Sequence, residues 1–357
     1  MQSSSPISTT SAGEQGAAPL IVGSRGSPLA LWQTNWALDR LHERTPDARL
    51  SIEIIKTQGD RTQALHTPLA QLGDKGVFVA ELEHALLAGT LDVAVQPMND
   101  HALAQAERTH SEDVEQGAHG IDVAVHSLKD LPSVVTPGLT LAAITEREDA
   151  RDALVSREGL KLADLPKGAT VATSSLRRRA QLLHLRPDLH IVEIRGNVDT
   201  RLRKTLSPDG PDATILAAAG MLRLGLADYI TELLPIEVMT PATGQGALAI
   251  ETRANDQHAR RLLHQIDHLP TRRAVTAERA VLATLGGGCR TPLGAHAIPL
   301  PDGKTLRLHA VIATPDGKRL LRIEREGAAR RPAALGRQVA RELLDMGAGE
   351  ILRIALG

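Results

Sequence analysis

The sequence predicts an α/β protein followed by a small α+β domain, and two patterns carry this prediction. Short apolar strands alternate with helical segments from residue 20 to about residue 250, which is typical of a sheet with crossover helices. Residues 268–357 instead contain two Pro-Asp-Gly turns, at 301–303 and 315–317, which indicate the hairpins of an antiparallel sheet. A chain of 357 residues is long enough for two or three domains.

Local signals define the first expected strand and helix. Leu20–Ser24 is short and apolar, as a buried strand is, and Ser27-Pro28 then marks a helix start because Ser caps helices and Pro suits their first turn. This helix is expected to end near Arg44 and to bury Leu31, Leu38 and Leu41. The other elements expected before residue 255 are strands at 50–54, 170–173, 191–194, 214–218 and 248–251, and helices at 76–88 and 176–186. Beyond them we expect helices near 256–266, 274–285 and 331–346.

An apolar pentapeptide occurs twice, as LDVAV at Leu91–Val95 and as IDVAV at Ile121–Val125. The first copy runs into Pro97, which a central strand tolerates poorly. We favour the second copy as the buried strand chiefly because only it continues into His126–Pro132 (HSLKDLP). Residues from about 92 to 121 are expected to be an inserted surface loop. The three histidines of this insertion do not have metal-ligand spacing, so no metal site is expected.

Composition excludes several classes of function. The single cysteine, Cys289, excludes an intramolecular disulfide framework and a cysteine-rich metal site. A net charge of −1 and four aromatic residues disfavour a nucleic-acid binder. Of the 41 Lys and Arg residues, 8 are Lys and 33 are Arg, which suits bidentate recognition of anions, although a GC-rich coding bias explains the surplus equally well. Residues 1–19 lack the pattern of a secretory signal, so a disordered tail and a cytoplasmic location are expected.

Three expected strands are followed by arginine with a hydroxyl residue or glycine beside it. Arg25 follows the first strand, Thr173–Arg178 (TSSLRR) leads into a helix, and Arg195 follows the strand at 191–194. Ligands of open α/β sheets bind at the carboxyl ends of the strands, and helix N-termini attract anions. The pattern therefore predicts a ligand with several carboxylates or phosphates, while a capped helix with solvated arginines is the alternative for any one segment alone.

Two further segments concentrate reactive groups. His126–Pro132 (HSLKDLP) follows the second pentapeptide, and cations beside Asp130 would keep it ionised and able to stabilise positive charge or relay protons. Three glycines precede Cys289, and Arg290 would favour its thiolate. The first segment suggests a catalytic carboxylate and the second a covalent attachment point, against the alternatives of an ordinary charged turn and an inert buried cysteine.

Taken in order, these segments closely resemble the porphobilinogen deaminase (hydroxymethylbilane synthase) family. The matching stretches are Gly23–Gln33, Thr57–Asp60, Thr67–Phe78, Asp122–Pro132, Glu146–Asp152, Thr173–Arg178, Arg195–Arg201, Ala219–Leu226, Pro241–Ala247 and Gly286–Gly294. The resemblance implies two α/β domains like type II periplasmic binding proteins, and a small α+β domain with a three-stranded antiparallel sheet. The implied boundaries are 20–147 plus 245–265 for the first domain, 148–244 for the second and 268–357 for the third.

The resemblance also implies an activity. Four porphobilinogen molecules would be condensed head to tail onto a dipyrromethane cofactor, with release of ammonia and then of hydroxymethylbilane. The cofactor would be joined by a thioether to Cys289, and the protein would be a monomer that binds neither nucleic acid nor membrane. The alternatives are a non-catalytic anion-binding protein on the same scaffold, a nucleic-acid binder that uses the arginine-rich helix, and a deaminase inactivated by the insertion.

Site residues follow from the family motifs. Asp130 and Lys129 would be catalytic. The cofactor would be held by Cys289, Lys75, Ser127, Asp130, Thr173, Ser175, Arg177, Arg178 and Arg195. Substrate carboxylates would be bound by Arg25, Ser27, Arg201 and Arg223. One departure is Gln71, where the family often has lysine, and the other is the insertion before the catalytic strand.

Overall fold

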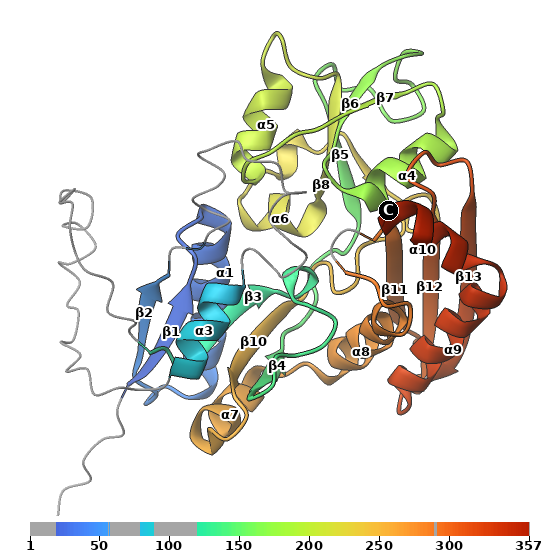
Figure 1. The fold of residues 1–357 in the computed structure, drawn as a ribbon. Coiled ribbons are helices and arrows are strands. Elements are labelled where there is room, and N and C mark those ends of the chain that lie inside the picture. Colours follow the sequence, from blue (N-terminus) through green and yellow to red (C-terminus); the bar gives the residue numbers. More distant parts are fainter. Residues whose placement is uncertain (1–18, 56, 58–78, 89–119, 289–290, 357) are drawn as a thin grey trace, which may run out of the picture.

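A computed structural model describes residues 19–55, 57, 79–88, 120–288 and 291–356, and these residues form three sheets (Figure 1). The first sheet has the order β2 (Leu50–Ile54), β1 (Leu20–Ser24), β3 (Val123–Ser127), β10 (Leu248–Arg253) and β4 (Leu139–Ile144). The second has the order β7 (His190–Val192), β6 (Thr170–Ala172), β8 (Ala213–Ala217), β5 (Asp152–Ser156) and β9 (Glu232–Leu234). The third contains β11 (Leu293–Pro299), β12 (Thr305–Ala313) and β13 (Leu320–Ala328).

The first two sheets share one topology. In each, the second strand in the order pairs in parallel with both neighbours, and the fourth pairs antiparallel with both of its own. The chain leaves the first sheet after β4, builds the second and returns in β10. This pair of sheets, with the separate antiparallel third sheet, confirms the predicted fold class, although the strands β4, β5 and β9 were not expected from the sequence.

Helix α1 (Pro28–Arg44) begins where predicted, because the Ser27 hydroxyl accepts a hydrogen bond from the amide of Ala30. Leu41 is buried as expected, but Leu31 and Leu38 are only half-buried. The fully buried face of the helix also includes two polar side chains, Gln33 and Thr34. The reason is that Gln33 and Thr34 bond to serines of the sheet: Gln33 Nε2 donates to Ser127 Oγ (2.9 Å) and Thr34 Oγ1 donates to Ser24 Oγ (2.8 Å).

The second copy of the repeated pentapeptide supplies the central strand, as predicted. Val123 and Ala124 of β3 are buried between β1 and β10, whereas the first copy lies outside the described residues. Helix α3 (Ala80–Ala88) covers this region with Leu82 and Leu86. A Cβ atom at Gly23 would lie 2.3 Å from Cδ1 of Ile121, so a larger residue there would force the Ile121 side chain to move.

In the second sheet the strand expected at 191–194 ends early. The Ser174 hydroxyl donates to the carbonyl of Ile194 (2.7 Å) and accepts from its amide (3.3 Å), which replaces strand pairing at that position. Helix α4 (Leu176–Leu185) matches the expected helix closely, with Ser175 as its N-cap. The remaining helices of this region are α5 (Val198–Leu206) and α6 (Ala218–Arg223).

The third sheet is an antiparallel meander whose two tight turns have positive φ at Gly303 and Gly317, as the Pro-Asp-Gly motifs predicted. Helices α8 (Leu269–Thr284) and α9 (Pro332–Asp345) pack against it. A third helix, α10 (Ala348–Leu356), also packs there and was not expected. The prediction of a start at 274 for α8 was wrong, because Pro270 stands in its first turn and suits a helix start there. Helix α7 (Gln257–Leu263) and a 3-10 turn at 264–266 precede it, in the expected place.

Glu278 of α8 joins the third sheet to the segments that connect the first two. Its fully buried carboxylate pairs with both terminal nitrogens of Arg147 (2.6 and 2.8 Å). The same carboxylate accepts hydrogen bonds from the amides of Gly244 and Ala297. Arg147 and Gly244 belong to the two connecting segments, and Ala297 belongs to β11, so one side chain fixes all three parts together.

Replacing Glu278 by Gln should lower the free energy of unfolding by roughly 2–3 kcal/mol. The reason is that Arg147 stays charged but loses the carboxylate with which it pairs. Urea denaturation of both proteins measures this difference. The control is Glu342→Gln, since the pair that Glu342 forms with Arg325 has side chains 28% and 48% exposed and should contribute less than about 1 kcal/mol. Equal losses in the two variants would contradict the connecting role of Glu278.

Candidate functional site

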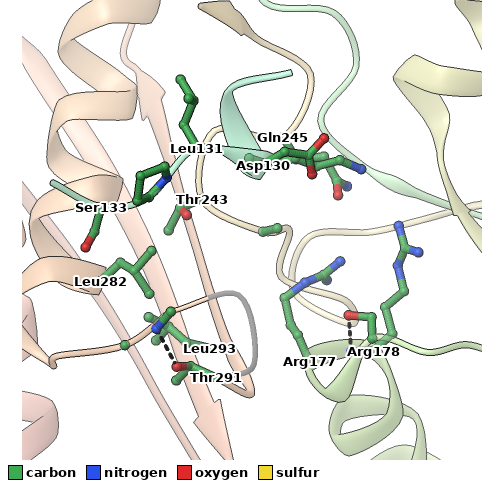
Figure 2. Close-up of a pocket in the computed structure, with 16 residues that line it drawn as sticks. Asp130, Leu131, Ser133, Arg177, Arg178, Thr243, Gln245, Leu282, Thr291 and Leu293 are labelled. Carbon is green, nitrogen blue, oxygen red and sulfur yellow. Dashed lines mark hydrogen bonds between the residues drawn. The ribbon is translucent and has the colours of Figure 1, made fainter. Parts of the chain in front are cut away.

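A cavity of about 320 Å³ lies where the three sheets meet (Figure 2). Its walls come from the turn at 129–133, the start of α4, the connecting segment at 242–245 and the chain around the end of α8. Charged and polar lining residues are Lys129, Asp130, Ser133, Ser175, Arg177, Arg178, Thr243, Gln245 and Thr291. This volume is within the range of small-molecule sites, and its polar lining predicts a charged ligand.

The turn after β3 directs two of the predicted catalytic residues to this cavity. Leu128 and Leu131 are buried anchors on either side, and the amide of Leu128 donates to the carbonyl of Ala247 (3.0 Å). Lys129 and Asp130 between them are half-buried and line the cavity. Burial lowers the pKa of Lys129, and the cations of Arg178 and Arg177 lower it further, while Asp130 opposes both effects. The turn thus places an ammonium and a carboxylate side by side at the cavity wall.

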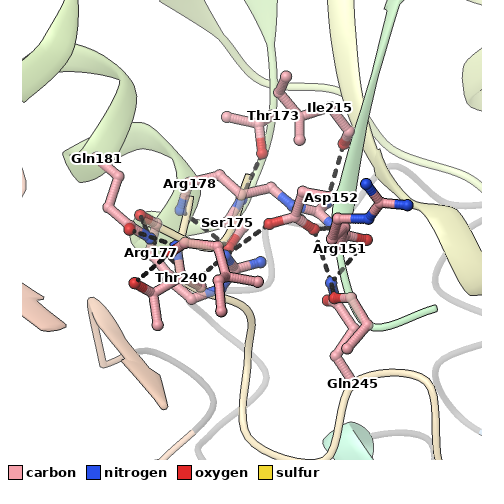
Figure 3. A network of polar contacts seen from close by, with 12 residues as sticks. Arg151, Asp152, Thr173, Ser175, Arg177, Arg178, Gln181, Ile215, Thr240 and Gln245 are labelled. Carbon is pink, nitrogen blue, oxygen red and sulfur yellow. Dashed lines mark hydrogen bonds and ion pairs between the residues drawn. The ribbon is translucent and has the colours of Figure 1, made fainter. Parts of the chain in front are cut away.

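Arg177 and Arg178, at the start of α4, converge on one buried carboxylate, that of Asp152 (Figure 3). Arg177 Nη1 donates to Asp152 Oδ2 (2.7 Å), and Arg178 donates to Oδ1 through Nε (3.1 Å) and Nη2 (2.7 Å). Gln245 Nε2 adds a fourth donor to this carboxylate (2.9 Å). Burial alone would raise the pKa of Asp152, but the two guanidinium groups outweigh it and hold that pKa well below its usual range.

The cluster of Arg177, Arg178 and Asp152 therefore keeps a net positive charge beside the cavity. All three nitrogens of Arg178 bond to Asp152 or to the carbonyl of Ile215. Arg177 uses only Nη1, toward Asp152 and the carbonyl of Thr240, in its contacts with the described residues. Its other two nitrogens make Arg177 the better placed of the pair to receive an anion, and Arg178 chiefly holds Asp152.

Arg201 of α5 belongs to the same electrostatic group. Burial lowers its pKa to about 10, the cation of Arg178 acts in the same direction, and Asp130 opposes them. Its Nε donates to the carbonyl of Gly196 (2.7 Å), a residue whose φ of 113° glycine adopts without strain. Arg195 is half-buried, with an ion pair to Glu193 at 3.4 Å. Both arginines thus follow β7 on the side of the sheet where a ligand was expected.

Arg223 lies apart from this group, between α6 and α1. Its Nη2 donates to the carbonyl of Gly246 (2.7 Å), and its guanidinium lies 5.8 Å from the ring centre of Trp32. Burial lowers the pKa of Arg223 to about 10, and Glu148 opposes the effect. Arg223 therefore bridges the two α/β sheets in this structure, a contact that the sequence did not indicate.

The predicted hydroxyl residues already serve local structure. Ser27 and Ser175 cap α1 and α4, and Ser127 bonds to Gln33. Thr173 Oγ1 accepts from the amide of Ser175 (3.2 Å). Arg25 follows β1 and is half-buried. These side chains lie at the strand ends where they were expected.

Lys75, Gln71 and Cys289 lie outside the described residues. The chain that leads to position 289 is described, and Gly287 and Gly288 line the cavity. The amide of Gly288 donates to Thr291 Oγ1 (2.9 Å), and a Cβ atom at Gly288 would meet no atom of the described residues within 4 Å. The approach to Cys289 therefore opens onto the same cavity as Lys129 and Asp130.

Sequence reasoning missed Asp152 and Gln245 as parts of the site. The one available signal was the need of two adjacent buried arginines for a counter-ion. Among the described residues no group of three or more His, Cys, Asp or Glu side chains could hold a metal ion. No helix in the described ranges is long and apolar enough to span a membrane.

Comparison with known proteins gives consistent matches. The family model "Porphobilinogen deaminase, dipyromethane cofactor binding domain" matches residues 20–119 and 112–261, and "Porphobilinogen deaminase, C-terminal domain" matches 272–345. The first model matches twice, and its two stretches overlap near the repeated pentapeptide.

Individual relatives match along nearly the whole chain. The chain is 45% identical to porphobilinogen deaminase of Pelotomaculum thermopropionicum, over 94% of this chain and 96% of that protein. It is 46% identical to that of Desulforudis audaxviator, over 93% and 96%. A solved substrate-binding protein of an amino acid ABC transporter is a distant likeness, with 11% identity, a TM-score of 0.33, and coverage of 70% of this chain and 91% of that one.

Proposed function

Because the chain belongs to the porphobilinogen deaminase family, we propose that the cavity between its three sheets is the active site of a hydroxymethylbilane synthase. The reaction joins four porphobilinogen molecules head to tail, releasing ammonia and finally hydroxymethylbilane, and the enzyme is a transferase. The observation that supports the location is the convergence of Asp130, Lys129, Arg177 and the approach to Cys289 on one cavity.

The residues of the cavity suit a dipyrromethane cofactor. Each of its pyrrole rings carries an acetate and a propionate group, and the cluster of Arg177, Arg178 and Asp152 offers a buried net positive charge. Arg177 also has two nitrogens that bond to no described residue. No described residue comes within 4 Å of a Cβ atom at Gly288, which supports the proposal that a group is attached at the next position in the sequence, Cys289. When bound there, dipyrromethane supplies the pyrrole carbon to which the first substrate is joined. The further contacts proposed for the cofactor are Lys129, Thr173, Ser175, Ser127, Arg195 and Lys75.

Asp130 is proposed as the catalytic carboxylate. It lines the same cavity as Lys129, Arg177 and Arg178, where a negative charge would stabilise the positive charge that develops on the substrate pyrrole as ammonia leaves. Lys129 and Arg177 would bind carboxylates of the substrate or cofactor through charge-assisted hydrogen bonds. In this proposal Asp130 acts in the reaction, and the neighbouring cations Lys129 and Arg177 bind carboxylates.

The outer arginines and Ser27 are proposed to bind substrate carboxylates. Arg201 is the best supported, since the charges of Asp130 and Arg178 both act on it. Arg25 and Ser27 stand at the end of β1 and the start of α1. Arg223 would have to keep its contact with Gly246 while it bound substrate with its remaining nitrogens.

The domain division is likewise proposed as 20–147 plus 245–265, 148–244 and 268–357. In its support, each sheet has a separate cluster of buried apolar side chains. Porphobilinogen is the partner that the family implies. A monomeric state and a cytoplasmic location complete the proposal.

The cofactor assignment is tested by intact-protein mass. Protein expressed with porphobilinogen available should exceed its sequence mass by two linked pyrrole units, and Cys289→Ser should abolish that increment, because the serine hydroxyl is a far weaker nucleophile than the thiolate. Ser133→Ala, a change in the same cavity, should keep the increment. An unmodified wild-type mass, or an increment that survives in Cys289→Ser, would refute the assignment.

A further inference from the structure

Arg279 connects α8 to the turn that carries Asp130. Its Nη2 donates to the carbonyl of Pro132 (2.6 Å) and to that of Ser133 (3.1 Å). Both residues line the cavity just after Asp130 (Figure 2). Helix α8 ends at Thr284, and Gly287 and Gly288, a few residues further on, line the same cavity. One guanidinium therefore spans the two parts of the chain that enclose the cavity.

A buried carboxylate on β10, that of Glu251, acts electrostatically on Arg279. Burial lowers its pKa, and the carboxylate of Glu251, on β10, opposes that effect. Glu251 is 1% exposed, and its Oε2 lies 3.2 Å from Nε2 of His126, which stands directly before Ser127. The printed geometry therefore ties Arg279 to the carbonyls that follow Asp130, while the carboxylate that counters the effect of burial on Arg279 is packed against the strand that precedes the turn.

The neighbouring residue gives α8 a fixed orientation. Glu278 binds Arg147 and the amide of Gly244 in the connecting segments. Because these contacts of Glu278 hold α8 against the connecting segments, the guanidinium of Arg279 sets the distance between α8 and the carbonyls of Pro132 and Ser133. A shift of α8 would move the glycine segment and the turn relative to each other.

We propose that Arg279 is a positioning residue, which holds the segment Asp130–Ser133 at a fixed place opposite the glycine segment that leads to Cys289. This inference rests on the proposed function, in which Asp130 is catalytic and Cys289 carries the cofactor. Arg279 itself lies outside the set of residues that line the cavity, so it acts through the turn and makes no contact with substrate.

The test compares Arg279→Met, which removes the charge and both hydrogen bonds, with Arg279→Lys, which keeps the charge beside Glu251 but loses the planar fork. Three quantities are measured for each: the fraction of protein with the cofactor mass increment, kcat and KM of the loaded enzyme, and the thermal unfolding midpoint. Arg273→Met is the matched control, because Arg273 lies on the same helix and makes no hydrogen bond or ion pair with the described residues.

We expect Arg279→Met to acquire the increment but to lose roughly 10-fold or more in kcat, since a displacement of about 1 Å can cost up to about 100-fold. KM should stay within about twofold, and Arg279→Lys should recover part of kcat. A kcat within twofold of wild type, or an equal loss in Arg273→Met, would overturn the proposal. If Arg279→Met does not fold, the same comparison of kcat with wild type and with Arg273→Met is made for Arg279→Lys. A wild-type enzyme without increment or turnover would instead contradict the proposed function.

Discussion

Replacing Asp130 by Asn should nearly abolish turnover while leaving the cofactor in place. The carboxylate lines the cavity beside Lys129 and acts on the buried charge of Arg201. An amide of the same shape preserves packing between the buried anchors Leu128 and Leu131, but it removes the negative charge that would stabilise the developing cation. The loss of one preorganised electrostatic contact of this kind typically lowers kcat by about 10²–10³-fold.

The measurement separates chemistry from binding. Steady-state kinetics should show a large fall in kcat with a smaller change in KM, because the charge is needed chiefly in the transition state. Intact mass should show the same two-pyrrole increment as wild type. Asp345→Asn, a surface change in the third sheet's helix α9, should leave both unchanged. Near-normal turnover of Asp130→Asn would move the catalytic role elsewhere, first to Asp100, which holds the corresponding position after the first pentapeptide.

Local signals explain which elements could be predicted from the sequence. Helix α1 begins at a serine cap followed by proline, and the third sheet turns at two Pro-Asp-Gly motifs, so a few adjacent residues determine each feature. The second pentapeptide could be chosen as the buried strand from the residues that follow it, since only this copy continues into HSLKDLP and proline follows the first copy. In each of these cases the residues that determine the feature are neighbours in the sequence.

The missed strands depend on distant parts of the chain. All five residues of β5 are buried, so the strand has no alternation of apolar and polar residues by which to recognise it. Its antiparallel pairing with β8 and β9 depends on the passage of the chain from one sheet to the other, which no local motif encodes. The early end of β7 likewise depends on a serine side chain twenty residues before Ile194.

The site divides in the same way. The sequence predicted that arginines would stand at strand ends and helix starts, because those positions are local, and the structure has Arg177, Arg178 and Arg201 there. It did not predict that Asp152, from a different strand, would bind the first two. Both arginines were expected to bind the ligand, and the pairing with Asp152 changes this expectation more for Arg178 than for Arg177. Arg177 still has two nitrogens that bond to no described residue.

Asp152→Asn should be the most destabilising single change in this region. The variant leaves two adjacent buried guanidinium groups without a counter-ion, and the loss of one partner from a buried pair costs about 3–5 kcal/mol. Asp149→Asn is the matched control, because Asp149 lies in the same segment and also binds an arginine through both oxygens. That pair has side chains 22% and 41% exposed, so its loss should cost less than about 1 kcal/mol.

The pH dependence of unfolding gives an independent check on Asp152. Its pKa in the folded protein is held below the ordinary value of about 3.9, so its contribution to stability is fully present above that pH and declines as the pH falls through the lower folded value. Asparagine does not titrate. The difference in unfolding free energy between wild type and Asp152→Asn, measured by urea denaturation, should therefore be constant near neutral pH and shrink below about pH 4. A difference no larger than that of Asp149→Asn, or one that grows in acid, would show that the two arginines do not depend on this carboxylate.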